Sequence, residues 1–236
     1  MSVVRVPLHL PDWLVPPLRR IKRSILDKDV DLRGDRDVEW SFIAGHLPTG
    51  PGRALDFGCN GTYLSLIAAR RGLKVVALDL EDQIQLWRHD NREFVCGDLL
   101  EVRFPESTFD VVINCSSVEH VGLAGRYSVS ASLSDGDLDA MKKLYYLMKP
   151  GGIQLLTIPL GRDTVFQPWH RVYGEKRLPM LLNGYDVVHQ EFWRKDRDQL
   201  WKTCEMDEAM KFNAAWDDKR RIYALGCFVL RRLTKD

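Results

Sequence analysis

The sequence predicts an α/β fold in which one mostly parallel sheet is covered by helices on both faces. Three observations support this prediction. Short and nearly continuous apolar runs, which are typical of strands buried on both faces, recur after residue 53. Segments with the apolar spacing of helices lie between them, and turns rich in glycine or proline separate the two kinds. A chain of 236 residues also suits one large domain better than two independent cores.

The first 50 residues are expected to form a helical extension. Four prolines before residue 18 keep the beginning of the chain irregular. Residues 14–26 then combine apolar side chains with several arginines and lysines, which indicates a basic amphipathic helix. We expect this helix to pack on the domain or to act as a lid, and the alternative is a peripheral contact with an anionic membrane. A second helix is expected at residues 35–46, before a proline- and glycine-rich break at residues 48–52. The main domain is therefore placed at residues 51–236.

The main domain alternates between strands and helices along the chain. The first five strands are expected at residues 54–57, 74–78, 93–96, 109–114 and 153–158. Helices are expected at residues 63–71, 138–148 and 175–182, and Lys-Pro-Gly-Gly at residues 149–152 is expected to be a turn. Two last strands are expected at residues 186–192 and 222–230.

Composition narrows the possible partners. The 34 lysines and arginines nearly balance the 33 aspartates and glutamates, so the formal net charge is +1. This balance gives no global attraction to nucleic acid, and a small or medium-sized molecule is the expected partner. The five cysteines show no CxxC pair and no metal-ligand spacing, which favours reduced thiols and a cytoplasmic location. No apolar run approaches the roughly 20 residues that a transmembrane helix needs. The oligomeric state stays open.

Polar or glycine-rich segments follow each of the first four strands. Residues 56–62, Asp-Phe-Gly-Cys-Asn-Gly-Thr, open a helix, so that backbone N–H groups there can face a ligand. Asp79 ends the second strand, where a carboxylate can accept both hydroxyls of a ribose. Gly97-Asp98-Leu99 follows the third strand and can receive an adenine, and Asn-Cys-Ser-Ser at residues 114–117 follows the fourth. The carboxyl ends of parallel strands meet at one edge of the sheet, which predicts a single ligand site there. A glycine-rich turn alone also fits a tight connection or a nicotinamide cofactor.

These segments, in this order, resemble the class I S-adenosylmethionine-dependent methyltransferases over residues 53–159. The resemblance also includes residues 109–120 and Leu-Met-Lys-Pro-Gly-Gly at residues 147–152. The resemblance implies a Rossmann-like sheet of seven strands, with an antiparallel pair at the end, and S-adenosylmethionine as cofactor. It also implies roles by position: Asp56, Gly58 and Asn60 at the methionine part, Asp79 at the ribose, Asp98 and Leu99 at the adenine, and Ser116 on the side of methyl transfer. The full set of cofactor-binding residues that it implies is Asp56, Phe57, Gly58, Cys59, Asn60, Asp79, Leu80, Asp98, Leu99 and Ser116. Asn60 and Thr62 stand where the family usually has glycines, and asparagine tolerates a left-handed backbone better than other residues.

Methyl transfer is an in-line displacement, in which the protein aligns the acceptor and removes a proton from a hydroxyl acceptor. His120 is the first candidate base, with Glu119 orienting it, and the alternative is that this pair only caps or packs the following helix. His170, in the loop at residues 159–173, is the second candidate, and its alternative is a structural hydrogen bond. Glu119 and His120 resemble part of a Glu-x-x-Glu-His metal pattern whose first position is Ser116 here, so no metal is expected.

The same loop and the insertion at residues 122–137 supply the expected substrate contacts. Arg171 is a candidate clamp for a carboxylate or phosphate, and Trp169 a candidate stacking surface for a sugar or aromatic ring. The expected substrate-binding residues are Arg126, Tyr127, Arg162, Trp169, Arg171 and Tyr173. The alternative is that these side chains order their own loops.

A narrower resemblance refines the expected function. Residues 116–127, 135–137, 159–163 and 170–174 are similar to a sparsely characterised family of methyltransferase-like domains often associated with surface-polysaccharide biosynthesis. This similarity extends to about residue 185 and bears on the substrate class by analogy. Together with the candidate histidine bases, it leads us to expect O-methylation of a small molecule or sugar. Transfer to nitrogen or carbon, methylation of nucleic acid or protein, and a non-catalytic subunit that binds S-adenosylmethionine are the alternatives.

Overall fold

The computed structural model describes residues 34–82, 88–127, 129–196, 200–216 and 221–234. All of them belong to one compact unit, residues 33–236. The helix expected at residues 14–26 lies outside the described residues, and the domain boundary expected at residue 50 stays a prediction. None of the helices in the described ranges has the length and apolar character of a membrane span.

One large sheet forms the centre of this unit, with the strand order β3-β2-β1-β4-β5-β12-β8-β9. The strands are β1 (Gly52–Phe57), β2 (Leu73–Asp79), β3 (Arg92–Cys96), β4 (Phe109–Cys115), β5 (Met148–Leu160), β8 (Tyr185–Lys195), β9 (Trp201–Thr203) and β12 (Ala224–Arg232). The first five pair in parallel, whereas β12 is antiparallel to both β5 and β8. The predicted parallel sheet and its antiparallel end are confirmed.

The sheet has eight strands in the described residues rather than the seven expected. The additional strand is β9, a short strand that pairs with β8 at the edge of the sheet. Its three residues are too few to give a periodic pattern in the sequence.

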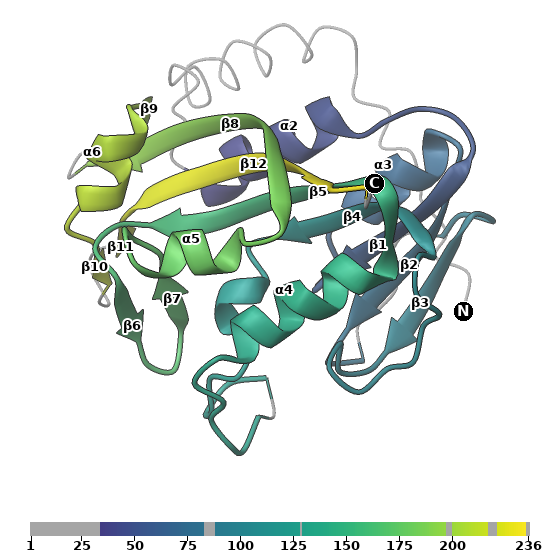
Figure 1. The fold of residues 1–236 in the computed structure, drawn as a ribbon, viewed down its shortest axis with the longest axis horizontal. Coiled ribbons are helices and arrows are strands. Elements are labelled where there is room, and N and C mark those ends of the chain that lie inside the picture. Colours follow the sequence, from purple (N-terminus) through teal and green to yellow (C-terminus); the bar gives the residue numbers. More distant parts are fainter. Residues whose placement is uncertain (1–33, 83–87, 128, 197–199, 217–220, 235–236) are drawn as a thin grey trace, which may run out of the picture. The chain divides into compact units, whose positions relative to one another are not determined.

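Helices cover both faces of the sheet (Figure 1). Helices α2 (Asp35–His46) and α3 (Leu64–Arg70) contact each other on one face, and α4 (Gly136–Leu147) and α5 (Arg177–Leu181) contact each other on the opposite face. A short helix, α6 (Met206–Lys211), packs on β8 and β12. The side chains of β1 alternate between the two faces, and Leu55 and Phe57 join the core under α4. This alternation decides which side chains of the strand can reach a ligand.

Two segments differ from the expected turn and loop. Residues 149–152 form a bulge inside β5, because Phe109 pairs with Met148 whereas Val111 pairs with Ile153. The left-handed backbone of Gly151, at φ +77°, permits it, and Lys149 closes it with an ion pair of 2.8 Å to Asp110. The expected loop at residues 159–173 contains a hairpin of β6 (Thr164–Phe166) and β7 (His170–Val172). A second small antiparallel pair joins β10 (Ala215–Trp216) to β11 (Arg221–Ile222).

Candidate functional site

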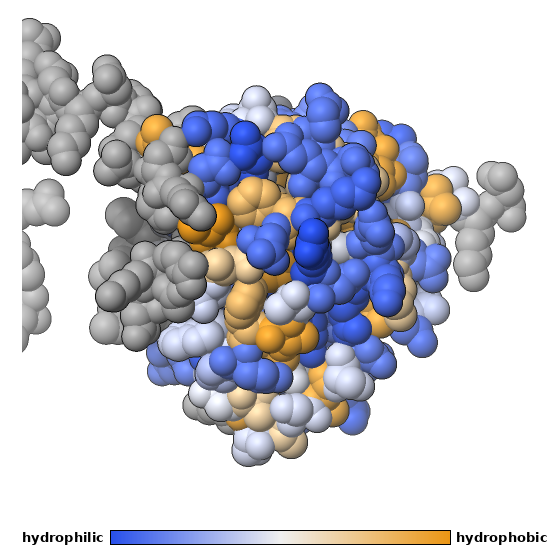
Figure 2. All heavy atoms as spheres, turned by 90° about the vertical axis from the view of Figure 1, so that its left-hand side faces the viewer, coloured by the Kyte–Doolittle hydropathy of each residue, from blue (hydrophilic) through white to orange (hydrophobic). Residues whose placement is uncertain are grey.

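A cavity of about 430 Å³ lies where the parallel strands end. Its wall comes from the loop after β1, the ends of β2, β3 and β4, the one-turn helix η1 (Val118–His120), helix α2 and the β6–β7 hairpin. Figure 2 looks onto this side of the molecule and shows hydrophobic residues gathered at its centre among hydrophilic ones. A volume of this size falls within the roughly 300–1,000 Å³ of small-molecule sites.

Most of the residues expected to bind a cofactor line this cavity. Eight of the ten do so: Phe57, Gly58, Asn60, Asp79, Leu80, Asp98, Leu99 and Ser116. Strand order explains the convergence, because β1 lies between β2 and β4, and β3 lies beside β2. The carboxyl ends of these neighbouring strands therefore share one edge of the sheet.

Asp79 and Asp98 are held in place by backbone N–H groups. One carboxylate oxygen of Asp79 accepts a hydrogen bond of 2.7 Å from the Asn60 N–H, and the other accepts one of 3.1 Å from Glu81. Asp98 Oδ1 accepts the N–H of Leu100 at 2.8 Å. Each carboxylate oxygen can accept more than one hydrogen bond, so both side chains keep acceptor capacity toward the cavity.

The loop after β1 has the left-handed backbone expected of a ligand-binding turn. Gly58, Asn60 and Gly61 have φ angles of +71°, +35° and +62°. Asn60 thus adopts a left-handed backbone, which asparagine tolerates better than other non-glycine residues. Gly58 also leaves no room for a side chain, since a Cβ there would lie 2.3 Å from Ser117 Oγ. The loop backbone at Gly58 therefore lies close to the side chain of Ser117, which follows β4, and both residues line the cavity.

Asp56 does not line the cavity, contrary to the expectation from the sequence. It lies within β1 and alternates with Leu55 and Phe57, so its side chain points to the face covered by α3. Its carboxyl group is buried against Ser65 of that helix, and burial raises its pKa to about 7. Cys59 is also fully buried and absent from the cavity wall, and burial raises the pKa of its thiol to about 12.

The two candidate bases line the cavity together. His120 Nδ1 lies 2.5 Å from the carbonyl oxygen of Trp169, so it must carry a proton and donate it. In the neutral ring Nε2 then keeps its lone pair. His170, only 4% exposed, lies with its ring centre 6.4 Å from that of His120, and its Nε2 has no hydrogen-bond partner among the described residues. Burial lowers the pKa of His120 to about 3 and that of His170 to about 4, so both are neutral at pH 7.

Glu119 lies beside His120 at the inner end of the cavity. Its Oε1 is 3.8 Å from His120 Nε2, and its Oε2 is buried with no hydrogen-bond partner in the part of the chain that the structure describes. Burial raises the pKa of Glu119 to about 8, so the group is mostly protonated at neutral pH. Proximity thus fits the expected pairing with His120, although 3.8 Å is too long for a direct hydrogen bond.

Helix α2 contributes three wall residues that the sequence did not indicate: Arg36, Glu39 and Trp40. Arg36 pairs with Glu39 at 2.6 Å, and Ser116 Oγ donates a hydrogen bond to the buried Glu39 carboxylate. A polar network therefore ties α2 to the end of β4. The helix was predicted, but no motif connects it to the site, and only its packing on β4 and β5 brings it there.

The expected substrate residues divide into two groups. Arg126, Tyr127 and Trp169 line the cavity, and the guanidinium of Arg126 lies 4.3 Å from the ring centre of Tyr127 and 5.2 Å from that of Trp169. Trp169 is 44% exposed, so this group forms a rim that a ligand can reach.

The remaining three expected substrate residues do not line the cavity. Arg171 is 3% exposed and donates to backbone carbonyls, among them those of Val121 at 2.5 Å and Leu133 at 3.0 Å. The expected anion clamp is therefore wrong, because the protein itself uses these donors. Tyr173 is fully buried and its hydroxyl donates to Asp137 at 3.1 Å. Arg162 is exposed outside the cavity wall.

The fold and this cavity define the class of protein: the chain has the Rossmann-like α/β fold of the methyltransferases. The crystal structure of the 1,6-didemethyltoxoflavin-N1-methyltransferase of Burkholderia thailandensis, with bound 1,6-didemethyltoxoflavin and S-adenosylhomocysteine, matches with a TM-score of 0.57. The match covers 98% of this chain and 94% of that one at 18% identity. At this identity the likeness concerns the fold.

Residues 98–219, just over half of the chain, match the family model described as "Caenorhabditis protein of unknown function, DUF268", and the chain belongs to this family. Curated relatives match part of the chain. The sterol 24-C-methyltransferase of Pneumocystis carinii (strain B80) is 25% identical over 64% of this chain and 44% of its own length. The malonyl-[acyl-carrier protein] O-methyltransferase of Serratia marcescens is 27% identical over 62% of this chain and 54% of its own length. The chain thus spans about half the length of the curated relatives it matches.

Proposed function

We propose that the protein is an S-adenosylmethionine-dependent methyltransferase that acts on a small molecule or sugar. The observation that carries the proposal is the convergence of Gly58, Asp79, Asp98 and Ser116, from four successive strand ends, on one cavity. The named relatives and the toxoflavin enzyme support methyl transfer as the reaction.

The wall residues fit such a cofactor. Asp79, fixed by two backbone N–H groups, has acceptor capacity left for the ribose hydroxyls. The carboxylate of Asp98 suits the amine of an adenine, and the apolar side chains of Leu80 and Leu99 suit its ring. The left-handed loop at Gly58 and Asn60 lets the backbone approach the amino-acid end of the ligand. A polar occupant is also favoured by three buried polar atoms of the cavity wall that have no partner within the described ranges, on Trp40, Glu119 and His170.

S-adenosylmethionine supplies an activated methyl group, so the chain has to align the acceptor, exclude water and remove the acceptor's proton. His120 is the proposed base, because the Trp169 carbonyl fixes its ring with Nε2 as the acceptor nitrogen. Its lowered pKa keeps Nε2 unprotonated at neutral pH, and it also makes the ring a weaker base than an ordinary histidine. His170, whose Nε2 has no hydrogen-bond partner among the residues described, is the second candidate.

The acceptor proposed is a hydroxyl on a small molecule or sugar. The aromatic rim of Tyr127 and Trp169 offers faces on which a sugar or a planar ring can stack, and Arg126 offers a positive charge between them. A narrow cavity of about 430 Å³ favours a small acceptor. The names of the related proteins specify carbon, oxygen and nitrogen as acceptors, so oxygen rests on the histidines alone. We also propose a cytoplasmic location, which the five free cysteines support.

The experiment that tests this function follows a labelled methyl group. The full chain is incubated with methyl-labelled S-adenosylmethionine in three separate reactions. One contains a small-molecule extract, one contains RNA and one contains protein. We expect label in the small-molecule fraction, and about 10–100-fold less label in that fraction with the Asp79→Ala variant when the cofactor is well below saturation. Label in RNA or protein alone would overturn the substrate class. Tight binding of S-adenosylmethionine without transfer in any fraction would overturn the enzymatic function in favour of a non-catalytic subunit.

A further inference from the structure

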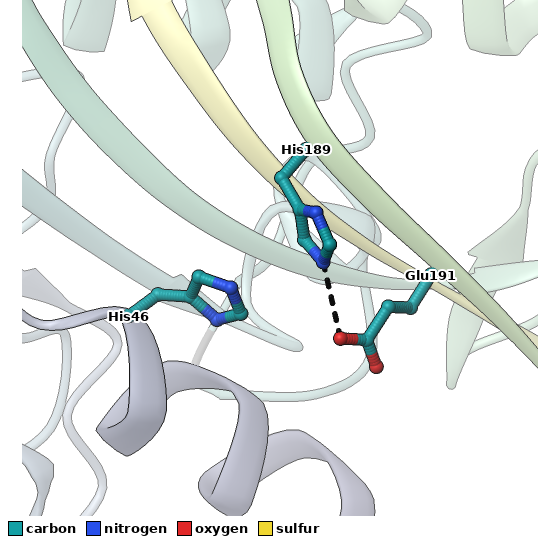
Figure 3. Close-up of side chains that lie close together, drawn as sticks. All are labelled: His46, His189 and Glu191. Carbon is teal, nitrogen blue, oxygen red and sulfur yellow. Dashed lines mark hydrogen bonds and ion pairs between the residues drawn. The ribbon is translucent and has the colours of Figure 1, made fainter.

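A cluster of potential metal ligands lies outside the cavity, between the end of α2 and strand β8. It consists of His46, His189 and Glu191, whose ligand atoms all lie within 4.8 Å of one another. Figure 3 shows His189 and Glu191 pointing to the same side from β8, with the His46 ring facing them from the end of α2. Two imidazoles and a carboxylate are a ligand set that Zn²⁺ prefers. None of these residues belongs to the cavity wall.

The backbone explains why these side chains meet. His189 and Glu191 are two residues apart on one strand, so they share a face of the sheet. Helix α2 packs on β4, β5 and β12, and β12 is the neighbour of β8. The last turn of α2 therefore delivers His46 to the same face, where the rings of His46 and His189 lie with their centres 4.9 Å apart.

Neighbouring groups orient two of the three ligands. His46 Nδ1 lies 2.9 Å from the carbonyl oxygen of Phe42, to which it donates its proton, and this leaves Nε2 as the free acceptor. Glu191 Oε2 accepts a bond of 3.4 Å from Trp193 Nε1, whereas Oε1 turns to His189 Nε2 at 3.1 Å. Metal-binding imidazoles and carboxylates are held by such outer hydrogen bonds, which fix the tautomer and the direction of the lone pair.

We propose that His46, His189 and Glu191 form a binding site for a divalent transition metal, with Zn²⁺ as the best fit. The ligands are His46 Nε2, His189 Nε2 and Glu191 Oε1, and a water molecule completes the tetrahedron. Ligands about 2.0–2.1 Å from zinc lie roughly 3.3 Å apart, so the His46 ring has to approach the β8 pair by a small side-chain rotation. His189 is 46% exposed at its side chain and Glu191 is 38% exposed, which gives the ion a path from solvent.

The metal would join α2 to the sheet. The C-terminal turn of the helix carries His46, and its N-terminal half carries Arg36, Glu39 and Trp40 of the cavity wall. Bound metal therefore stabilises the helix that forms one side of the cavity, and its loss should loosen that side. This role does not depend on the proposed methyl transfer.

Calorimetric titration of the full chain, free of any added histidine tag, with Zn²⁺ tests the site. We expect about one Zn²⁺ per chain and a rise in Tm when it binds. His46→Ala and His189→Ala should each weaken binding at least about tenfold, and Trp193→Phe, which removes only the outer hydrogen bond, about tenfold. His89→Ala, which removes an imidazole elsewhere, is the matched control and should bind like the wild type.

A cobalt titration separates this site from other thiol or imidazole sites. Co²⁺ in a tetrahedral site gives intense visible absorption, and we expect it in the wild type and in His89→Ala but not in His189→Ala. Equal Zn²⁺ affinity in the wild type, His46→Ala and His189→Ala would overturn the proposal. So would a wild-type protein that binds no Zn²⁺, which would leave the contact between His189 and Glu191 as a simple hydrogen bond.

Discussion

His120 has the geometry of a proton acceptor because its surroundings fix both its tautomer and its charge. The Trp169 carbonyl takes the Nδ1 proton, and burial keeps the ring neutral. General-base catalysis contributes about 10²–10⁴-fold to a rate. We expect His120→Ala to lower kcat by about this factor while S-adenosylhomocysteine binding stays within about twofold of the wild type. His89→Ala, at a histidine outside the cavity, serves as the control, and unchanged kcat in His120→Ala would assign the proton transfer elsewhere.

Glu119 makes the stability of the protein depend on pH. Burial raises its pKa in the folded protein to about 8 from an ordinary value near 4.5. The folded state thus holds this proton more tightly than the unfolded state does. The contribution of Glu119 to stability is complete below about pH 4.5 and is lost as the pH rises through about 8.

The isosteric variant Glu119→Gln removes this titration. Between pH 5 and pH 8 the unfolding free energy of the wild type should fall relative to that of the variant, by up to about 1.4 kcal/mol per pH unit. Urea denaturation of both proteins at several pH values measures the difference. Parallel curves for the two proteins would show that Glu119 titrates normally.

Among the single elements, strand β7 holds the insertion at residues 122–137 in place through the side chain of Arg171. Arg171 reaches from β7 to the carbonyl of Val121, just before this insertion, and to that of Leu133 within it, and it lies 3.6 Å from the buried Asp137. Replacing it removes the Arg171 donor from the Val121 carbonyl and a positive charge from beside the buried Asp137, whereas the Leu133 carbonyl keeps the N–H of Gly136. We expect Arg171→Met to destabilise the protein by about 3 kcal/mol. Arg162→Met, at an exposed arginine nearby, should change stability by less than about 0.5 kcal/mol. Normal stability with a raised KM would instead restore Arg171 as a substrate clamp.

The loop after β1 depends on glycine for two separable reasons, conformation and space. Gly58 and Gly61 both have left-handed backbones, but only at Gly58 would a Cβ meet another group, Ser117. We expect Gly61→Ala to cost about 1–2 kcal/mol of stability from its conformation. Gly58→Ala should cost more and weaken S-adenosylhomocysteine binding at least about tenfold, since the loop must move at the cavity floor. Thermal denaturation and calorimetry of both variants measure this, and equal behaviour of the two would contradict the close approach.

Elements with strong apolar patterns could be predicted from the sequence, helix α2 with both of its ends, whereas elements that depend on distant partners could not. The parallel strands and most helices appear where expected, because continuous apolar runs and helical spacing are local signals. Residues 149–152 were expected to be a turn and instead bulge within β5, since the pairing of Asp110 with Lys149 is a contact between distant segments. The same holds for the β6–β7 hairpin and for β9, which are stabilised by partners rather than by their own pattern.

The direction of individual side chains was the least predictable feature. Asp79 and Asp98 stand just at or after strand ends and line the cavity, whereas Asp56, only slightly earlier in its strand, points to α3. Arg171 looked like an anion clamp because its residue type permits that role, but burial gave it backbone partners. Glu39 and the cluster of His46 with His189 went unnoticed because their partners are remote in the sequence.

For the whole molecule, the order of strands creates the site. Neighbouring strands β3, β2, β1 and β4 bring their ends to one edge, where helix α2 and the β6–β7 hairpin complete the wall. No single motif is sufficient to define the ligand site. The glycine-rich loop, Asp79 and Asp98 indicate a site only because they line the same cavity. The central claim is that this volume binds the adenosyl part of S-adenosylmethionine.

Calorimetric titration with S-adenosylhomocysteine tests this claim most directly. We predict that the wild-type chain binds one equivalent and that Asp79→Ala weakens binding by about 10–100-fold, the loss expected for hydrogen bonds to a charged group. Asp90→Ala, at an exposed aspartate outside the cavity, should bind like the wild type. A wild-type chain that binds no S-adenosylhomocysteine, or an Asp79→Ala variant that binds it as tightly as the wild type, would contradict the assignment of this cavity.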